Sequence, residues 1–216
     1  LLEGLLSGDS GQLLSCMYAF EASPGQTALV ESGVPLALGA GCFALEIQEP
    51  SDLTLRLERR TASGSVVPDE ICHLGIGYAA MFSLIRCDHL SREQLLQKYV
   101  MEPKPLYEWP NGRIIRLVDD AACPYFQMDR VEVVSCLDFP APAQFYGLFV
   151  LQGKGQLLCK DRHFPLFPGE QFFVPADCPA IRLSAWLSTI PTFASFHSAP
   201  IGFFAGYTFP FPDSNE

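Results

Sequence analysis

The sequence lacks the features that mark nucleic-acid-binding and membrane-spanning proteins. Its 14 Lys and Arg residues form no basic tract and are outnumbered by 24 Asp and Glu residues, which gives a formal net charge of −10. Such a chain has no electrostatic footprint for nucleic acid or anionic lipid. The longest apolar run, Leu74 to Ile85, is too short for a transmembrane helix, which needs about 20 residues.

The N-terminal residues LLEGLLSG lack the basic n-region of a secretory signal peptide. We therefore expect a cytoplasmic protein. Because the chain does not begin with Met, we also expect that its start was removed or that it is a piece of a longer protein.

The eight cysteines form no C-x-x-C pair, and no cluster of Cys and His has zinc-finger spacing. Most of them lie in apolar surroundings, as Cys42 and Cys136 do. A chain of 216 residues is long enough to bury a core without covalent cross-links. We expect buried thiols in a reducing cytoplasm rather than a disulfide framework.

Three zones differ in character along this chain, which is 49% apolar and rich in Gly and Pro. Residues 1–60 are strand-like pieces, and the segments 42–50 and 52–60 alternate apolar and polar residues as a half-buried strand does. Residues 61–120 read as a helical and loop connector. Residues 121–216 return to strands joined by turns.

Local signals refine this division. The apolar segment 77–87 predicts a buried helix, and Ser91 with Gln94 fits a capping box that starts a second helix. The segment 102–112 contains three prolines and a glycine, so we expect a connector there. Gly153-Lys154-Gly155 between two apolar runs predicts a hairpin. The aromatic tail 201–216 has no predicted place in the fold.

An internal repeat links the first zone to the third. The pattern P-G-[QE]-x3-V-x4-P begins at Pro24 and again at Pro168. Gly suits the tight turn into a strand, Val its buried face and Pro its end. Repeated architecture favours a mainly β fold of double-stranded β-helix (jelly-roll) units, one partial in residues 1–60 and one complete in residues 121–216, with a short helical connector.

The densest group of polar residues lies in the first zone. It includes Glu46, Gln48, Asp52 and Arg56. By period-2 counting Glu46, Gln48 and Arg56 share one strand face if the register holds. Glu46 beside Arg56 is then either an acid/base group with an anion clamp or a salt-bridged pair at a strand edge.

The segment GVPLALGAGCFALEIQEPSDLTLR resembles a motif of the class I (cupin-type) mannose-6-phosphate isomerases. The matching positions are Gly33, Pro35, Ala37, Gly39, Gly41, Glu46, Ile47, Gln48, Ser51, Asp52, Thr54 and Arg56. The later segments VLQGKGQLL and FPGEQFFVPA are similar to the metal-free C-terminal cupin barrel of that family. The resemblance covers most of residues 10–190 and indicates the C-terminal part of such a protein.

This resemblance implies a zinc-dependent aldose–ketose isomerisation between mannose 6-phosphate and fructose 6-phosphate in hexose metabolism. By position, Arg56 matches the family's catalytic arginine and Glu46 its proposed proton-transfer carboxylate. Asp52 and Gln48 match positions that support or bind substrate. Such chemistry needs a Lewis acid, a base poised near neutrality and cationic groups for the phosphate.

This chain departs from the family's set of metal ligands at one decisive position. The final His ligand of the family belongs where this chain has Leu36, and Leu has no lone pair for a metal. No His precedes His73, and the four His residues have no ligand spacing. We therefore expect no zinc or other cofactor in this chain.

Two functions from different classes remain open. The first is an isomerase-family protein that is impaired or incomplete as this chain alone. The alternative is a non-catalytic cupin remnant that binds a sugar phosphate or a protein partner. A first barrel without its opening strands would expose edges and apolar surface, so we expect self-association or a second chain that completes it.

Overall fold

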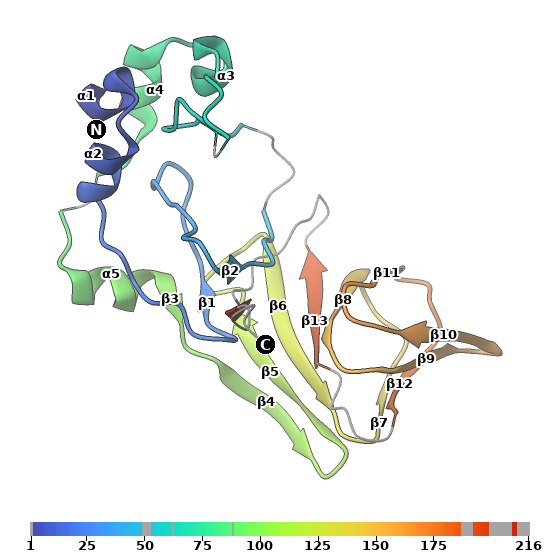
Figure 1. Ribbon diagram of the computed structural model, residues 1–216. Helices are drawn as coiled ribbons and strands as arrows, with labels where there is room; N and C mark the ends of the chain where they lie inside the picture. Colours follow the sequence, from blue (N-terminus) through green and yellow to red (C-terminus); the bar gives the residue numbers. More distant parts are fainter. Residues whose placement is uncertain are drawn as a thin grey trace, which may run out of the picture. The chain divides into compact units, whose positions relative to one another are not determined.

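The computed structural model describes residues 2–48, 53–61, 63–87, 89–186, 192–198 and 209–210 (Figure 1). The chain divides into two compact units, one formed by Leu1–Val100 with Phe204–Glu216 and the other by Met101–Phe203. Within the described residues, every helix is too short or too polar to cross a bilayer. The expected domain limits at residues 60 and 120 stay a prediction.

The second unit contains two β-sheets. The larger sheet has the strand order β11-β8-β13-β6-β5-β4, and the smaller one has the order β10-β9-β12-β7. Every pairing within them is antiparallel. The strands are β4 (Lys104–Trp109), β5 (Gly112–Val118), β6 (Phe126–Val133), β7 (Cys136–Phe139), β8 (Tyr146–Gln152), β9 (Gly155–Cys159), β10 (Arg162–Leu166), β11 (Gln171–Val174), β12 (Ile181–Ala185) and β13 (Thr192–Ser198).

The core of this unit is built from alternating residues of both sheets. Along β8, Tyr146, Leu148 and Val150 are buried while the residues between them are half-exposed. Strand β12 buries Ile181 and Leu183 in the same way. Period-2 burial on two sheets is the pattern of a jelly-roll sandwich, so the predicted mainly β, jelly-roll fold class is confirmed. The cluster comprises Val131, Val133, Leu137, Tyr146, Leu148, Val150, Leu157, Leu166, Val174, Ile181 and Leu183.

The turn Gly153-Lys154-Gly155 does not close a hairpin, so that prediction is wrong. Strands β8 and β9 belong to different sheets, and the turn carries the chain from one to the other. The hairpin is one connection later, where Cys159 pairs with Arg162 and Lys160 adopts a positive φ of 53°. Gly155 is required for another reason: a Cβ there would overlap the carbonyl oxygen of Ser184 on β12. Only a residue without Cβ permits this close strand approach.

The proline-rich segment 102–112 forms a strand rather than a connector. Strand β4 occupies most of it and pairs with β5 at the end of the larger sheet. The register shifts between Pro105 and Tyr107, which marks a bulge. Proline, a bulge and a lysine, here Lys104 at the first position of the strand, are characteristic of edge strands, since such strands need not donate every ladder bond. The prediction of a connector is therefore wrong, because an edge strand can have the proline-rich composition of a loop.

The first unit is mostly helical and irregular. Its helices are α1 (Leu2–Ser7), α2 (Ser10–Ser15), α3 (Asp69–His73), α4 (Tyr78–Leu84) and α5 (Arg92–Tyr99). Strand β1 (Thr27–Ala28) pairs with β3 (Val100–Met101), and β2 (Cys42–Phe43) pairs with β14 (Phe209–Pro210). The expectation of strands throughout residues 1–60 is wrong, because α1 and α2 occupy the start. Asp9 caps α2 by accepting the N–H groups of Gly11 and Gln12 at 2.9 and 3.2 Å.

The two predicted helices of the connector are confirmed. Helix α4 lies within the apolar segment 77–87 and buries Met81. Helix α5 begins at the predicted capping box: the Gln94 N–H donates to Ser91 Oγ at 3.3 Å, and the Ser91 N–H donates to Gln94 Oε1 at 2.8 Å. These reciprocal bonds satisfy two amides that the helix itself cannot pair.

The internal repeat folds into the same turn in both units. The Gln26 N–H donates to Ser23 O at 3.0 Å, and the Glu170 N–H donates to Phe167 O at 3.1 Å. In each turn the side chain of the last residue accepts the N–H of the first, at 3.2 and 2.9 Å respectively. Gly25 and Gly169 both have positive φ, at 77° and 91°. Proline followed by left-handed glycine is the requirement of a type II turn.

Candidate functional site

The motif segment runs through the first unit largely without strand structure. Leu55 and Leu57 are half-buried and pack against the small cluster of Leu5, Leu13 and Met81. Thr54, Arg56 and Glu58, on either side of these leucines, are exposed, so the predicted alternation is present over residues 54–58. No ladder accompanies it, because the described part of the segment joins a sheet only at β2. Apolar contacts with α1, α2 and α4 impose the alternation instead.

The candidate catalytic side chains are all exposed where they can be placed. Glu46, Gln48 and Arg56 each face solvent, and Asp52 lies outside the described residues. The shared strand face expected for Glu46 and Arg56 is wrong, because neither residue is in a strand. No hydrogen bond or ion pair joins the described side chains of Glu46 and Arg56. The structure therefore does not bring the predicted acid/base group and anion clamp together.

A group of hydrogen bonds around Asp69, which the sequence did not indicate, links the segment after Arg56 to α3 and α4. Asp69 Oδ1 on α3 accepts hydrogen bonds from Arg59 and from the Tyr78 hydroxyl, the latter at 2.9 Å. Burial and this bond to Asp69 raise the pKa of Tyr78 to about 12. The Arg56 N–H also donates to Cys72 O at 2.9 Å. One hydrogen bond thus holds the Arg56 backbone against α3, the ion pair of Arg59 with Asp69 adds a second link to that helix, and Arg56 itself is exposed.

The residues present do not fit the zinc site that the family resemblance implies. Leu36, at the position of the family's His ligand, is 58% exposed. No three His, Cys, Asp or Glu side chains among the described residues are grouped to hold an ion. His73 has a structural role: its Nδ1 accepts the N–H groups of Gly75 and Gly77 at 3.1 and 3.2 Å. Its ring also contacts that of Tyr78, with centroids 4.9 Å apart.

Among the residues that the structure describes, the interior of the second unit offers no polar site either. The positions that face the space between its sheets are apolar, as Leu148, Leu157 and Leu183 show. A charged pair, Arg116 with Asp129, lies at opposed positions of β5 and β6, and Asp129 is 5% exposed. Each charge compensates the other, so the pair is a structural contact. The barrel is a packed core rather than a binding cavity.

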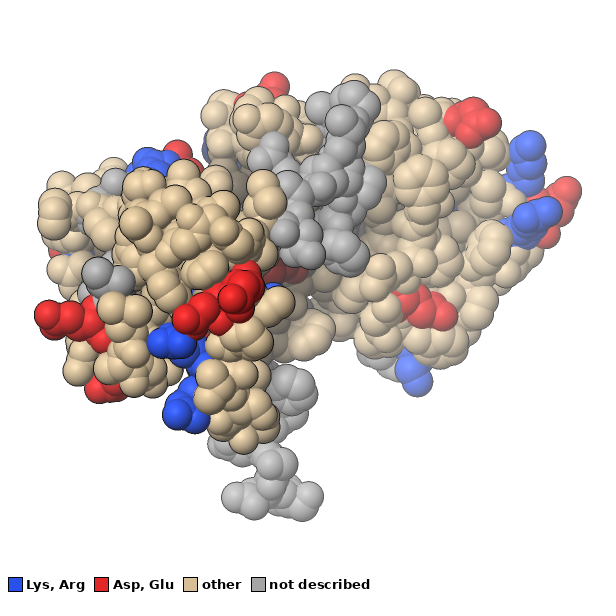
Figure 2. Space-filling model, turned by 90° about the horizontal axis from the view of Figure 1, so that it is seen from above, with Lys and Arg blue, Asp and Glu red and all other residues tan. Residues whose placement is uncertain are grey.

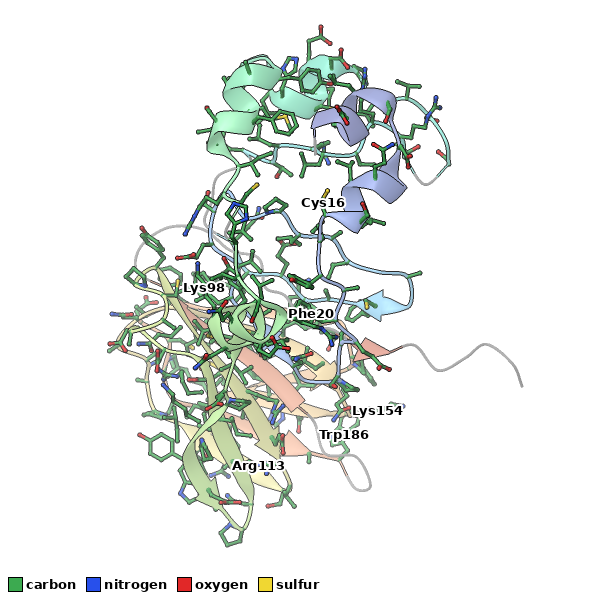
Figure 3. The ribbon with its side chains drawn as sticks, turned by 90° about the vertical axis from the view of Figure 1, so that its left-hand side faces the viewer. Cys16, Phe20, Lys98, Arg113, Lys154 and Trp186 are labelled. Atoms are coloured by element: carbon green, nitrogen blue, oxygen red, sulfur yellow. The ribbon has the colours of Figure 1, made fainter. Side chains whose placement is uncertain are left out.

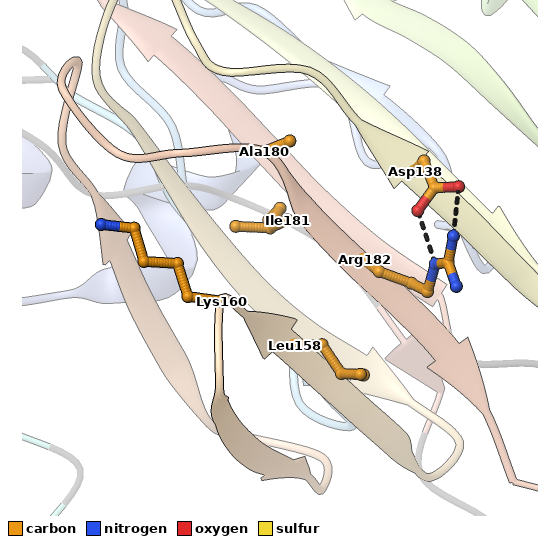
Figure 4. Close-up of a pocket in the computed structure, with 6 residues that line it drawn as sticks. All are labelled: Asp138, Leu158, Lys160, Ala180, Ile181 and Arg182. Carbon is orange, nitrogen blue, oxygen red and sulfur yellow. Dashed lines mark hydrogen bonds and ion pairs between the residues drawn. The ribbon is translucent and has the colours of Figure 1, made fainter.

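A shallow pocket of about 250 Å³ opens on the smaller sheet of the second unit. Arg182 donates two hydrogen bonds to Asp138, at 2.6 and 2.8 Å, across paired strands β12 and β7 (Figure 4). This bond and the charge of Arg182 hold the pKa of Asp138 below its usual range. Sequence reasoning missed the pair because strand register alone makes these residues neighbours. The lining residues are Asp138, Leu158, Lys160, Ala180, Ile181 and Arg182.

The two tryptophans are both in the second unit, and one anchors the turn between its sheets. The Trp186 N–H donates to Lys154 O at 3.0 Å, and its ring meets that of Phe167 edge-on at 5.8 Å. Lys154 and Trp186 lie close together in Figure 3. On the face shown in Figure 2, acidic and basic side chains are scattered in small mixed groups without a broad patch of one sign. The surface therefore shows no dominant electrostatic docking site there.

Comparison with known proteins gives a family match for part of the second unit. Residues 120–193 match the family described as mannose-6-phosphate isomerase, cupin domain. No curated protein sequence matches the chain. Among solved structures, it is similar to the mannose 6-phosphate isomerase of Bacillus subtilis, at 17% identity and a TM-score of 0.49 over 66% of this chain and 40% of that one.

Two other solved structures match smaller shares of this chain. A cupin superfamily protein of Desulfitobacterium hafniense matches 43% of this chain and 82% of its own, at 12% identity and a TM-score of 0.35. Ectoine synthase of P. lautus matches 51% of this chain and 86% of its own, at 12% identity and a TM-score of 0.38. The match agrees with the resemblance noted in the sequence: residues 120–193 are similar to the cupin domain of mannose-6-phosphate isomerases.

Proposed function

We propose that this protein is a sugar-phosphate-binding member of the mannose-6-phosphate isomerase family that does not catalyse isomerisation as this chain alone. Its first unit presents the family's substrate-side residues, and its second unit is a structural cupin barrel. The observation that carries the proposal is the exposure of Arg56 and Glu46 beside a segment in which Leu36 replaces the metal-binding His.

Arg56 supports the binding half of this proposal. Its guanidinium forms no ion pair with any described residue, whereas Arg59, three residues later, is bound to Asp69. An arginine on an anchored backbone with an unengaged guanidinium suits a phosphate or carboxylate oxygen, which it can bind through two N–H groups. Glu46 and Gln48 would then meet sugar hydroxyls as hydrogen-bonding groups.

Leu36 supports the non-catalytic half. Moving a proton between two sugar carbons requires a polarised carbonyl, which the family's ion provides. The described residues supply no ligand group for such an ion. The isomerisation of mannose 6-phosphate would therefore require a second polypeptide that contributes the ligands, with Arg56 and Glu46 contributed by this chain.

Calorimetric titration with mannose 6-phosphate tests the binding proposal. We expect saturable binding that Arg56→Ala weakens by about 10-fold or more, since a charge-assisted bond contributes roughly 1.5–3 kcal/mol. Arg60→Ala is the matched control, because Arg60 is an exposed arginine four residues away that donates only to Gly64 O at 3.1 Å. Unchanged affinity in Arg56→Ala would overturn the role of this side chain.

A coupled turnover assay tests the absence of catalysis. The purified chain is mixed with mannose 6-phosphate, with and without added zinc, and its metal content is measured. We expect no turnover and no stoichiometric zinc. Turnover that rises with zinc, or an ion at unit occupancy, would show that the chain is an enzyme by itself.

Association of the chain follows from its first unit. The unit exposes Leu36, Leu38 and Leu53 around the motif, and an apolar surface of this kind favours burial against another chain. We expect self-association or a second chain that completes the first barrel, which light scattering measures directly. A monodisperse monomer would count against it. The cytoplasm remains the proposed location.

A further inference from the structure

Two cysteines from different parts of the second unit lie side by side. The Sγ atoms of Cys159 and Cys178 are 3.7 Å apart. Cys159 ends β9, and Cys178 lies in the turn before β12, where its N–H donates to Pro175 O at 3.0 Å. Both side chains are half-buried and pack against the core cluster. Neither residue belongs to the motif or to any site discussed above.

The pairing of β9 with β12 fixes this proximity. Cys159 is the register partner of Ile181, three residues after Cys178. The turn from Pro175 to Ala180 therefore folds back over the end of β9. A thiol pair on a paired strand and an adjacent turn needs only side-chain rotation and a small shift of the turn to reach the S–S bond length of about 2.05 Å.

We propose that Cys159 and Cys178 are a reversible dithiol–disulfide modification site that exchanges with a small-molecule disulfide such as oxidised glutathione. One cysteine thiolate attacks a sulfur of the small disulfide, forms a mixed disulfide and releases one thiolate. The second cysteine then attacks the protein-bound sulfur and releases the other. Two protons and two electrons leave the cysteines, and the small disulfide is reduced to two thiols.

The surroundings oppose ionisation of one thiol of the pair. Burial, the hydrogen bond with Cys159 and the charge of Asp177 raise the pKa of Cys178, while the neighbouring Lys160 partly opposes this. The hydroxyl of Tyr146 also faces the pair. Because the thiolate is the attacking species, exchange at Cys178 is slower than at an unperturbed thiol. Whichever cysteine attacks the small disulfide first, the sulfur of the other is close enough to resolve the mixed disulfide.

The disulfide would act on the pocket of the smaller sheet. Cys159 directly precedes Lys160, and Cys178 lies two residues before Ala180, and both of these neighbours line the pocket. A bond between the two sulfurs fixes the turn against the strand. Oxidation thus makes one side of the pocket rigid, and reduction releases it.

The test uses the full chain in which Cys16 and Cys87, both exposed, are replaced by Ser. The folded protein is equilibrated with oxidised and reduced glutathione, quenched with acid and mapped by mass spectrometry. We expect a loss of two hydrogen atoms, a cross-linked peptide pair containing residues 159 and 178, and a melting temperature raised by roughly 5–10 °C. Excess reduced glutathione should reverse all three changes.

Matched variants decide the assignment. Cys136→Ser, at a half-buried cysteine of β7, should keep the cross-link, and Cys159→Ser should abolish it. Cys178→Ser should instead accumulate a mixed disulfide on Cys159. The proposal is overturned if Cys159 and Cys178 remain thiols at a glutathione ratio that modifies Cys16 of the unsubstituted protein. It is equally overturned if the cross-link forms between other cysteines.

Discussion

The two units differ in how far they enclose their apolar side chains. The second unit surrounds eleven core residues with two sheets. The first unit buries only Leu5, Leu13 and Met81 as a cluster in its described part and leaves Leu6, Leu14 and Leu53 exposed. Burial of apolar area is the main stabilising term of folding. The second unit therefore accounts for most of the folding stability expected of this chain.

The turn that both units share shows that the difference in burial between them does not arise from local sequence. Pro24-Gly25 and Pro168-Gly169 form the same hydrogen bonds, yet only the second turn leads into a strand of a full sandwich. Strand β11 follows the second turn and pairs with β8 over four residues, whereas β1 contains two residues. A turn sets the direction in which the chain continues, but a stable barrel forms only where further strands are present to pair with it.

The largest expected effect comes from the core of the second unit. Leu183 is 1% exposed, and Leu183→Ala should lower the free energy of unfolding by about 2–5 kcal/mol because it leaves a cavity. Leu36→Ala, in the first unit, should change it by less than about 0.5 kcal/mol. Urea unfolding followed by tryptophan fluorescence measures both, since Trp109 and Trp186 report on the second unit. Equal effects would contradict the contrast between the units.

The next effect concerns the close approach of two strands. Gly155→Ala places a Cβ on the Ser184 carbonyl and should cost about 1–3 kcal/mol of stability by forcing β9 from β12. Gly39→Ala is the control in the first unit, because a Cβ at that position meets nothing within 4 Å. Fluorescence-monitored unfolding compares them. A fully stable Gly155→Ala protein would show that β9 and β12 are farther apart than described.

The repeated turns allow the most direct comparison. Gly169→Ala forces a Cβ residue into a left-handed conformation and should lower the stability of the second unit by roughly 1–2 kcal/mol. Gly25→Ala makes the same change in the first unit and should leave the tryptophan-detected transition unchanged. Unfolding curves of the two variants decide this. A shift of that transition in Gly25→Ala would mean that the two units unfold as one.

The smallest effect is electrostatic. The hydrogen bond from Lys104 Nζ, at 2.6 Å, and that from the Ala122 N–H lower the pKa of Asp119. A lowered pKa in the folded state stabilises the protein at neutral pH, and this contribution is lost as pH falls through the carboxylate range. Asp119→Asn should therefore flatten the acid side of the pH–stability profile by less than about 1 kcal/mol.

The matched control for this measurement is Asp161→Asn, which changes an exposed aspartate in the turn between β9 and β10. Urea midpoints at several pH values give both profiles. The role assigned to Asp119 fails if its variant and the control have the same profile as the unsubstituted protein.

The helix starts and turns that depend on neighbouring residues alone could be predicted from the sequence. Ser91 and Gln94 predicted the start of α5, and the apolar segment 77–87 predicted α4. The prolines and glycines of the repeat predicted two equivalent turns. Asp9, a capping residue before a short apolar run, was a usable signal for α2 that was not recognised.

Long-range pairing explains the errors. Gly153-Lys154-Gly155 has hairpin composition, but the sandwich sends the next strand to the other sheet. The polar site residues Glu46 and Arg56 were expected on one strand face, and no strand forms there. The Asp138–Arg182 and Cys159–Cys178 contacts depend on strand register, which a single sequence does not reveal.

The bulged edge strand β4 has one more consequence. Pro105 cannot donate a ladder hydrogen bond, and the register shift between Pro105 and Tyr107 interrupts the regular repeat of the ladder. A strand of another molecule could therefore form only an incomplete ladder of hydrogen bonds with this edge. The barrel is therefore protected against fibril growth at the end where its sheet would otherwise extend.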